Sequence, residues 1–262
     1  MIQFLKQVAY HYYDLGDISD RCFVFPNRRS MVFFRKWLTA RVVEAAESGC
    51  ARPFVAPRML TINDFFHNVS GLGQADRVEL LLELYACYRE LNPKAETLDE
   101  FIFWGNVLLS DFNDVDKYMV KAENLFTNVA QFREMQDSLD YLEPVQLEAV
   151  KRFISHFKTG GRYKDEFRRI WDILLPLYQS FNESLDKKGM SYEGKVYRAL
   201  AERLSDESVV DVLAPHFRAV EKFVFVGLNA LNECEKRMMR KMRDAHIAEF
   251  CWDYSSEWIK DK

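Results

Sequence analysis

The sequence lacks the glycine-rich phosphate loop of nucleotide hydrolases: neither Gly-Lys-Ser nor Gly-Lys-Thr occurs anywhere in its 262 residues. Without that loop nothing cradles the β- and γ-phosphates of ATP. A hydrolase would also place a magnesium-binding Asp-Glu after an apolar strand, but the run Phe223–Val226 is followed by Gly227, Leu228 and Asn229. We therefore expect no ATP hydrolysis, no cofactor and no enzymatic activity from this chain.

Cysteine pairs and long apolar runs are also missing. The five cysteines are scattered, none has CxxC spacing, and no histidine is close enough to complete a zinc pattern. They are Cys22, Cys50, Cys87, Cys234 and Cys251. The first residues have no uncharged apolar core, and no run approaches the length of a membrane span. These absences predict reduced thiols in a cytoplasmic protein without a signal peptide and without a membrane partner.

An excess of basic charge is absent as well. The chain has 36 basic and 40 acidic residues, for a formal net charge of −4, while 48% of its residues are hydrophobic. That balance argues against a protein that coats nucleic acid with its whole surface, but it leaves room for a local basic groove. The apolar fraction is large enough for a sizeable core.

What the sequence does contain is a set of short apolar runs near both ends. Phe23–Phe25, Met59–Ile62, Phe223–Val226 and Ile247–Trp252 are typical of buried strands. A helix is expected from about Ile2 to Tyr13, another through Val32–Val42, and a third from about Asn232 to Ala245. Strand, helix and strand at this spacing predict a parallel βαβ unit. We therefore expect an α/β fold in which all four strands share one mostly parallel sheet.

The middle of the chain, from about Ala75 to Glu221, shows no convincing strand and has apolar residues at helical spacing. The expected helices include Val78–Tyr88, Phe101–Leu109, Val145–Phe157, Phe167–Phe181 and Val196–Leu204, with Ser191 as the expected cap of the last. This predicts a discontinuous α/β domain of residues 1–74 and 222–262, interrupted by an all-helical insertion of residues 75–221.

Asn27, Arg28, Arg29 and Ser30 follow the first strand, where a helix should begin. Such a turn places polar side chains and amide donors at the carboxyl edge of a sheet, where α/β proteins hold phosphates. Two guanidinium groups at a helix amino terminus could grip a nucleic-acid backbone. The alternative is an ordinary helix start with two solvated arginines.

Thr61 and Asn63 follow the second strand in the same way. Both side chains could bond phosphate, and a neighbouring phenylalanine could stack on a base. The alternative is helix capping, with Asn63 as the N-cap, above two core phenylalanines.

Two further patterns have catalytic counterparts. The cluster Asp111–Asp116 does not match a calcium loop, because Val115 occupies a ligand position and Asp116 replaces the glycine. A helix end followed by a cap is expected there. Glu193 and Lys195 have the Glu-x-Lys spacing of metal-dependent nucleases, but their flanks have helical period. Glu233 and Glu235 are expected to be solvated on a helix.

Five strings together resemble the amino-terminal part of the B-type (AddB/RexB-like) subunit of bacterial helicase–nucleases, in a divergent branch of the PD-(D/E)XK nuclease family. They are Phe23–Arg29, Leu60–Phe66, Asp111–Tyr118, Tyr192–Arg198 and Phe225–Lys236. The resemblance covers essentially the whole chain. It implies a degenerate RecA-like (P-loop NTPase-like) superfamily-one helicase domain with a helical insertion, which tracks single-stranded DNA without driving translocation.

The resemblance also implies partners and a wider protein. An A-type ATPase/helicase subunit would supply the motor, and a PD-(D/E)XK exonuclease domain would lie downstream, so the chain is expected to be truncated. The function hypothesis is an inactivated helicase-like, DNA-binding module acting in double-strand break processing and recombinational repair, with Asn27, Arg28, Arg29, Ser30, Thr61 and Asn63 on the DNA. One alternative is a scaffold that binds only the ATPase subunit. The other is a metal-dependent nuclease using Glu193 and Lys195.

Overall fold

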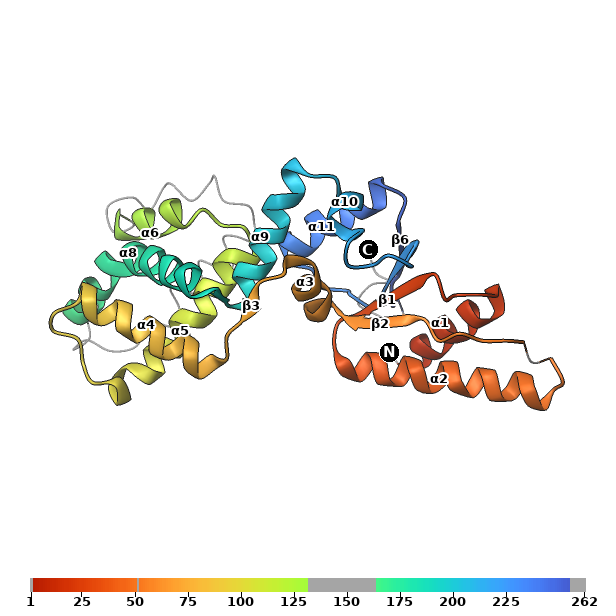
Figure 1. The fold of residues 1–262 in the computed structure, drawn as a ribbon. Coiled ribbons are helices and arrows are strands. Elements are labelled where there is room, and N and C mark those ends of the chain that lie inside the picture. Colours follow the sequence, from red (N-terminus) through yellow and green to blue (C-terminus); the bar gives the residue numbers. More distant parts are fainter. Residues whose placement is uncertain (1, 51, 132–163, 255–262) are drawn as a thin grey trace. The chain divides into compact units, whose positions relative to one another are not determined.

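The computed structural model describes residues 2–50, 52–131 and 164–254 (Figure 1). The chain divides into two compact units, a sheet unit of Met1–Gly71 with Leu200–Lys262 and a helical unit of Leu72–Ala199. The second boundary therefore lies inside a helix rather than at residues 221/222, where the sequence predicted it. The physical reason is that residues between 200 and 221 pack on the sheet unit: Phe217, for example, stacks on Phe65 with ring centroids 5.5 Å apart.

The sheet unit contains one four-stranded parallel sheet, so the prediction for these strands is confirmed. Its strands are β1 (Arg21–Phe25), β2 (Arg58–Thr61), β5 (Lys222–Val226) and β6 (Ala248–Cys251), in the order β2-β1-β5-β6. In the register, Phe25 lies opposite Thr61 and Val226 lies opposite Cys251. All four carboxyl ends therefore meet at one edge of the sheet.

Helices cover both faces of this sheet (Figure 1). One face, with Phe23, Phe25 and Val224, packs against α1 (Ile2–Leu15) and α2 (Arg28–Glu47). The other face, with Phe223 and Phe225, packs against Phe65 of α3 (Ile62–Ser70). Two more helices belong to that second face, α10 (Val209–Leu213) and α11 (Glu233–Asp244). Because both faces are covered, the strands are the continuous apolar runs that parallel sheets require.

The helical unit is built from α4 (Arg77–Leu91), α5 (Leu98–Lys117), α6 (Ala122–Gln131), α8 (Lys164–Lys188) and the first turns of α9 (Glu193–Asp206). Its core includes Leu84, Phe101, Phe112, Leu177 and Phe181, all fully buried. The helix expected over Val145–Phe157 lies outside the described residues. No helix in the described ranges is both long enough and apolar enough to cross a membrane.

The expectation of a strandless middle is wrong in one place. A two-residue strand β4 (Met190–Ser191) pairs in parallel with β3 (Gly73–Gln74). The Ser191 hydroxyl donates to the carbonyl oxygen of Gly73 at 2.7 Å, so Ser191 joins this ladder instead of capping α9. A strand of two residues is too short to show an alternating apolar pattern. Its pairing partner is also more than a hundred positions away, so nothing local in the sequence indicates the pairing.

Candidate nucleic-acid interface

The winding of the sheet changes direction between β1 and β5. The chain leaves β1, passes along one face through α2 and enters β2, whereas it leaves β5, passes along the opposite face through α11 and enters β6. In open α/β sheets, ligands bind outside the carboxyl ends of the strands at such a switch point. The segments that meet there are Pro26–Asn27, before α2, and Gly227–Asn229, before α11.

Asn27 and Ser30 start α2. The Asn27 Oδ1 accepts from the backbone N–H of Ser30 at 2.9 Å and from its hydroxyl at 3.2 Å, and Ser30 is only 4% exposed. This is ordinary N-capping. The two side chains are therefore engaged with each other, and their role in the structure is to fix the position of the two arginines between them.

Arg28 and Arg29 are exposed on the first turn of α2. Among the residues that the structure describes, no carboxylate forms an ion pair with either of them. The Arg29 guanidinium lies 5.9 Å from the centroid of the Phe33 ring, which supports its extended position along the helix. Both cations are thus available to an anion.

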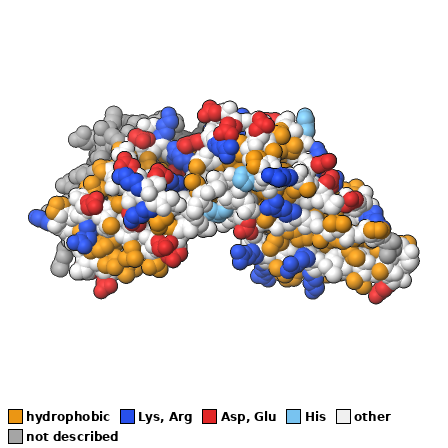
Figure 2. Space-filling model, in the orientation of Figure 1, with side chains coloured by type: hydrophobic (Ala, Val, Ile, Leu, Met, Phe, Trp, Pro, Cys, Tyr) orange, Lys and Arg blue, Asp and Glu red, His pale blue; other side chains and the backbone are white. Residues whose placement is uncertain are grey.

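The exposed cations continue along α2. Arg35 and Lys36 lie seven residues beyond Arg28 and Arg29, two turns along the same side of the helix, and both are exposed. We call these four residues the α2 basic ridge. The first acidic residue of α2 is Glu44, so the ridge has no acid within it. Figure 2 shows Lys and Arg side chains gathered over α2. Arg35 and Lys36 were not identified from the sequence as candidate DNA contacts. Their seven-residue spacing from Arg28 and Arg29, two helical turns, could have indicated them.

The start of α2 differs electrostatically from the starts of α3, α4, α5 and α11 and, like that of α1, has no acid in its first turn. The amino end of a helix carries a partial positive charge, which acidic side chains normally offset. First turns that contain an acid include those of α3 with Asp64, α4 with Glu79, α5 with Glu100 and α11 with Glu235. The first turn of α2 has none. Two arginines on the positive end of a helix are unfavourable by about 0.3–1 kcal/mol each, so a bound phosphate would relieve this repulsion.

Thr61 is the N-cap of α3, and the expectation that Asn63 holds this position is wrong. The Asp64 backbone N–H donates to the Thr61 Oγ1 at 3.1 Å, and the Thr61 hydroxyl donates to the Asp64 carboxylate at 2.7 Å. Thr61 is 6% exposed, and Asn63 is exposed one residue inside the helix. The carboxylate of Asp64 would repel a phosphate here, so this helix start is less suited to DNA than that of α2.

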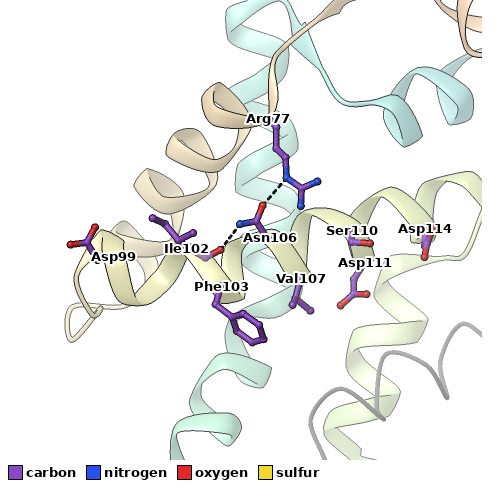
Figure 3. A pocket seen from close by; sticks show the side chains of 9 residues that line it. All are labelled: Arg77, Asp99, Ile102, Phe103, Asn106, Val107, Ser110, Asp111 and Asp114. Atoms are coloured by element: carbon purple, nitrogen blue, oxygen red, sulfur yellow. Dashed lines mark hydrogen bonds between the residues drawn. The ribbon is translucent and has the colours of Figure 1, made fainter.

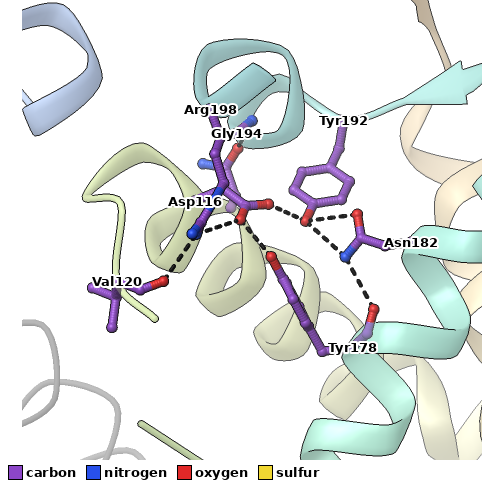
Figure 4. A network of polar contacts seen from close by, with 8 residues as sticks. Asp116, Val120, Tyr178, Asn182, Tyr192, Gly194 and Arg198 are labelled. Carbon is purple, nitrogen blue, oxygen red and sulfur yellow. Dashed lines mark hydrogen bonds and ion pairs between the residues drawn. The ribbon is translucent and has the colours of Figure 1, made fainter. Parts of the chain in front are cut away.

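In the helical unit, two of the strings noted in the sequence meet around a buried carboxylate (Figure 4). Asp116 is 1% exposed and accepts from the Tyr178 hydroxyl at 2.5 Å, from the Tyr192 hydroxyl, and from the Arg198 Nη1 at 3.3 Å. Arg198 also donates to the carbonyl oxygen of Val120 at 2.8 Å. Burial raises the pKa of Asp116, and the bonds from Tyr178, Tyr192 and Arg198 lower it in part.

The same two strings approach closely at Gly194. Its backbone N–H donates to the Asn113 Oδ1 at 2.7 Å, and a Cβ added to Gly194 would lie 2.4 Å from the Asn113 carbonyl oxygen. The cluster Asp111–Asp116 lies in the last turns of α5, which ends at Lys117, so the helix end falls directly after the cluster. We define the α5–α9 junction as this contact between Asp111–Tyr118 and Tyr192–Arg198.

Glu193 and Lys195 are both engaged at this junction. Glu193 pairs with Lys117 at 2.8 Å, and Lys195 pairs with Asp186 at 2.8 Å and donates to the carbonyl oxygen of Asn182 at 2.9 Å. Among the described side chains, no group of three histidines, cysteines or acids could hold a metal ion. The geometry therefore gives this pair a structural role.

A hollow of about 880 Å³ lies against α4 and α5 in the helical unit (Figure 3). The Arg77 Nε donates to the Asn106 Oδ1 at 2.7 Å, and the Asn106 amide donates to the carbonyl oxygen of Ile102. Phe103 projects from the same helix and is 71% exposed. This is an open and partly apolar surface, which fits protein contact better than chemistry on a small molecule.

Comparison with known proteins assigns the chain to no family and gives no function to these residues. We found no family model that matches the chain and no curated protein that matches it. The functional argument therefore depends on the positions, charges and contacts described above.

Proposed function

We propose that this chain is an inactivated helicase-like module that binds single-stranded DNA within a helicase–nuclease acting on broken DNA ends. In this proposal the parallel sheet is a degenerate RecA-like core, the helical unit is its insertion, and the chain belongs to an AddB-like subunit. The wider protein would carry the exonuclease domain, and an A-type subunit would supply ATP-driven movement.

A single observation carries the proposal. Arg28 and Arg29 stand at the switch point of a parallel sheet, on a helix start that has neither an acid nor a described ion-pair partner. Phosphate contacts supply most of the non-specific affinity of DNA-binding proteins and need no base contact. The rest of the α2 basic ridge extends the same charge along the helix, as a backbone-tracking surface requires.

The sequence favours holding a polyanion over hydrolysing a nucleotide. The switch point has polar amides and cations, but the strand end at β5 is followed by Gly227, Leu228 and Asn229, which carry no carboxylate for magnesium. Gly227 has φ of 71°, a conformation suited to glycine that turns the chain sharply at this edge.

A second candidate function is that of a scaffold whose only ligand is the ATPase partner subunit. The observation that favours it is an exposed apolar face on α4 and α5, where Val78, Leu82, Ile102 and Phe103 are 41–71% exposed. Exposed apolar patches of this kind are typical of protein–protein interfaces. The two functions are compatible, since the face and the basic ridge are different surfaces.

The test of the DNA proposal is the double substitution of Arg28 and Arg29 by alanine, with binding to fluorescent oligothymidylate measured at several salt concentrations. We expect weaker binding and a log–log salt slope that is shallower by about 0.7 for each lost contact. The matched control replaces Arg218 and Lys241, two exposed cations of the same unit, and so makes the same change in net charge.

The control should leave the affinity and the slope close to those of the parent protein. If both double variants weaken binding equally, the effect comes from net charge alone and Arg28 and Arg29 form no phosphate site. If neither variant changes binding, the scaffold function becomes the better account of the chain.

A further inference from the structure

A stack of aromatic rings runs from the core of the sheet unit to its β6 edge. Phe225 is 1% exposed, and its ring stacks on that of Phe250 with centroids 5.5 Å apart and planes 16° apart. Phe250 then stacks on Trp252, with centroids 5.8 Å apart and planes 1° apart. Phe250 and Trp252 are only half-buried. The stack therefore ends in aromatic surface that solvent reaches.

Cationic side chains border the outer end of this stack. A hollow of about 260 Å³ is lined by Leu231, Lys236, Met239, Arg240, Arg243, Phe250 and Trp252. The three cations lie at positions i, i+4 and i+7 of α11, so they share one face of that helix. Two flat rings and three cations thus surround one cavity.

The cations already have acidic neighbours. Glu233 pairs with Lys236 at 3.6 Å and with Arg240 at 3.4 Å, and Arg243 pairs with Asp244 at 2.9 Å. All three pairs are partly or largely exposed, with side-chain exposures of 32–64%. Exposed pairs of this kind contribute little and exchange readily, so a phosphate can replace a carboxylate.

One end of the hollow, at Trp252, lies near the same edge of the sheet as the candidate phosphate site. Trp252 follows β6 directly, so it lies at the same carboxyl edge as Asn27, which follows β1 closely. Only β5 separates these strands, and a strand spacing of about 4.8 Å places their ends roughly 10 Å apart. A short single-stranded segment can therefore reach both places at once.

We propose that this hollow is a nucleobase site, in which a base of bound single-stranded nucleic acid stacks on Trp252 while Arg240 and Arg243 face its backbone. The inference rests on the proposed function, in which Arg28 and Arg29 bind the backbone of the same strand. Base–aromatic stacking beside cations is how proteins hold single strands without reading their sequence.

The test compares two probes, an oligothymidylate and an abasic deoxyribose-phosphate oligomer of equal length. The parent protein should bind the base-containing probe more tightly. Trp252→Leu keeps apolar volume but removes the stacking surface, so it should lose about 5- to 150-fold in affinity for oligothymidylate and almost nothing for the abasic oligomer. Trp252→Phe should retain most of the difference between the probes.

A second measurement covers the case in which Trp252→Leu does not fold. Tryptophan fluorescence of the parent should be quenched by oligothymidylate, and Trp252→Phe should lose that quenching while keeping its affinity. A matched control is Trp104→Phe, which alters a tryptophan on α5 in the helical unit and should leave the quenching in place.

Other outcomes overturn the inference and separate it from the DNA proposal. If the parent binds both probes equally and the Arg28/Arg29 double variant weakens both, the phosphate site stands and the nucleobase site fails. If the parent binds neither probe, both fail. If Trp252 is quenched by a partner protein but not by oligothymidylate, the hollow is a protein contact.

Discussion

The α5–α9 junction and the carboxyl edge of the sheet both contain distinctive polar residues in the sequence. They differ in whether those polar groups bond within the protein or remain exposed to solvent. At the junction, Asp116 and Gly194 bond to groups within the same unit. At the sheet edge, Arg28 and Arg29 are exposed, and no described carboxylate pairs with them. The comparison shows that distinctive strings can mark either packing or binding, and that partners distinguish the two.

The largest effect should follow from removing the carboxylate at the centre of the junction. Asp116→Ala removes the carboxylate that accepts from the Arg198 guanidinium and from the Tyr178 and Tyr192 hydroxyls. Breaking a buried charge pair from one side costs about 3–5 kcal/mol in the free energy of unfolding. Urea denaturation measures this. The control is Glu90→Ala, an exposed acid of the same unit, which should change stability by less than about 0.5 kcal/mol.

A loss at Asp116 no larger than that at Glu90 would break the comparison. It would mean that the buried network contributes nothing to the stability of the helical unit. The junction would then need a functional explanation.

Gly194→Ala should have the next largest effect. The added Cβ would lie 2.4 Å from the Asn113 carbonyl oxygen and 2.9 Å from its Cα, and backbone atoms cannot move aside as a side-chain end can. Overpacking of this kind costs about 1–3 kcal/mol. Thermal denaturation checks it. A useful contrast is Ala199→Gly on the same helix, which should cost only the helix propensity of about 1 kcal/mol.

The parts of the fold that the sequence predicted are those with a strong local signal. The four strands are continuous runs such as Phe23–Phe25 and Phe223–Val226, whose apolar character shows directly that both faces are covered. The start of α2 at Asn27 was also predictable, because a capping residue follows a strand and a proline. Local chemistry sufficed in these cases.

The parts that could not be predicted depend on distant contacts or on choices between similar residues. The partners of Asp116 are 62 to 82 positions away, so the sequence showed an acidic cluster but not its burial. Thr61 and Asn63 are both favoured as N-cap residues. Thr61 holds the N-cap position because its hydroxyl accepts from the Asp64 backbone N–H. Glu235 was expected to be solvated, but it is 7% exposed, and its carboxylate accepts from the Asn232 backbone N–H.

The pH dependence of stability should sharpen the description of the junction. Burial raises the folded pKa of Asp116 above the ordinary value of 3.8, so the folded state holds this proton more tightly than the unfolded state. The contribution of Asp116 is therefore fully present below pH 3.8 and is lost as the pH rises through the raised folded pKa. Asp116→Asn removes this titration.

The stability of the parent relative to Asp116→Asn should consequently fall as the pH rises above 3.8. Urea denaturation of both proteins across an acid-to-neutral series gives this difference directly. The opposite slope would mean that Tyr178, Tyr192 and Arg198 stabilise the carboxylate by more than burial destabilises it.

The smallest effect on stability is expected at the outer half of the α2 basic ridge. Arg35 and Lys36 are exposed and have no ion pair among the described residues, so replacing both by alanine should change the free energy of unfolding by less than about 0.5 kcal/mol. If DNA follows the ridge along α2, the same variant should still weaken oligothymidylate binding, with a salt slope shallower by about 0.7 for each lost contact. An equal weakening for thymidine and abasic probes is expected, because phosphates carry no base information.

If instead the affinity is unchanged while the Arg28/Arg29 variant is weakened, the strand leaves α2 at its first turn and turns along the sheet edge toward β6. Either result fixes the path of the backbone, and a loss of stability in place of a loss of affinity would show that the ridge, like the α5–α9 junction, serves the fold.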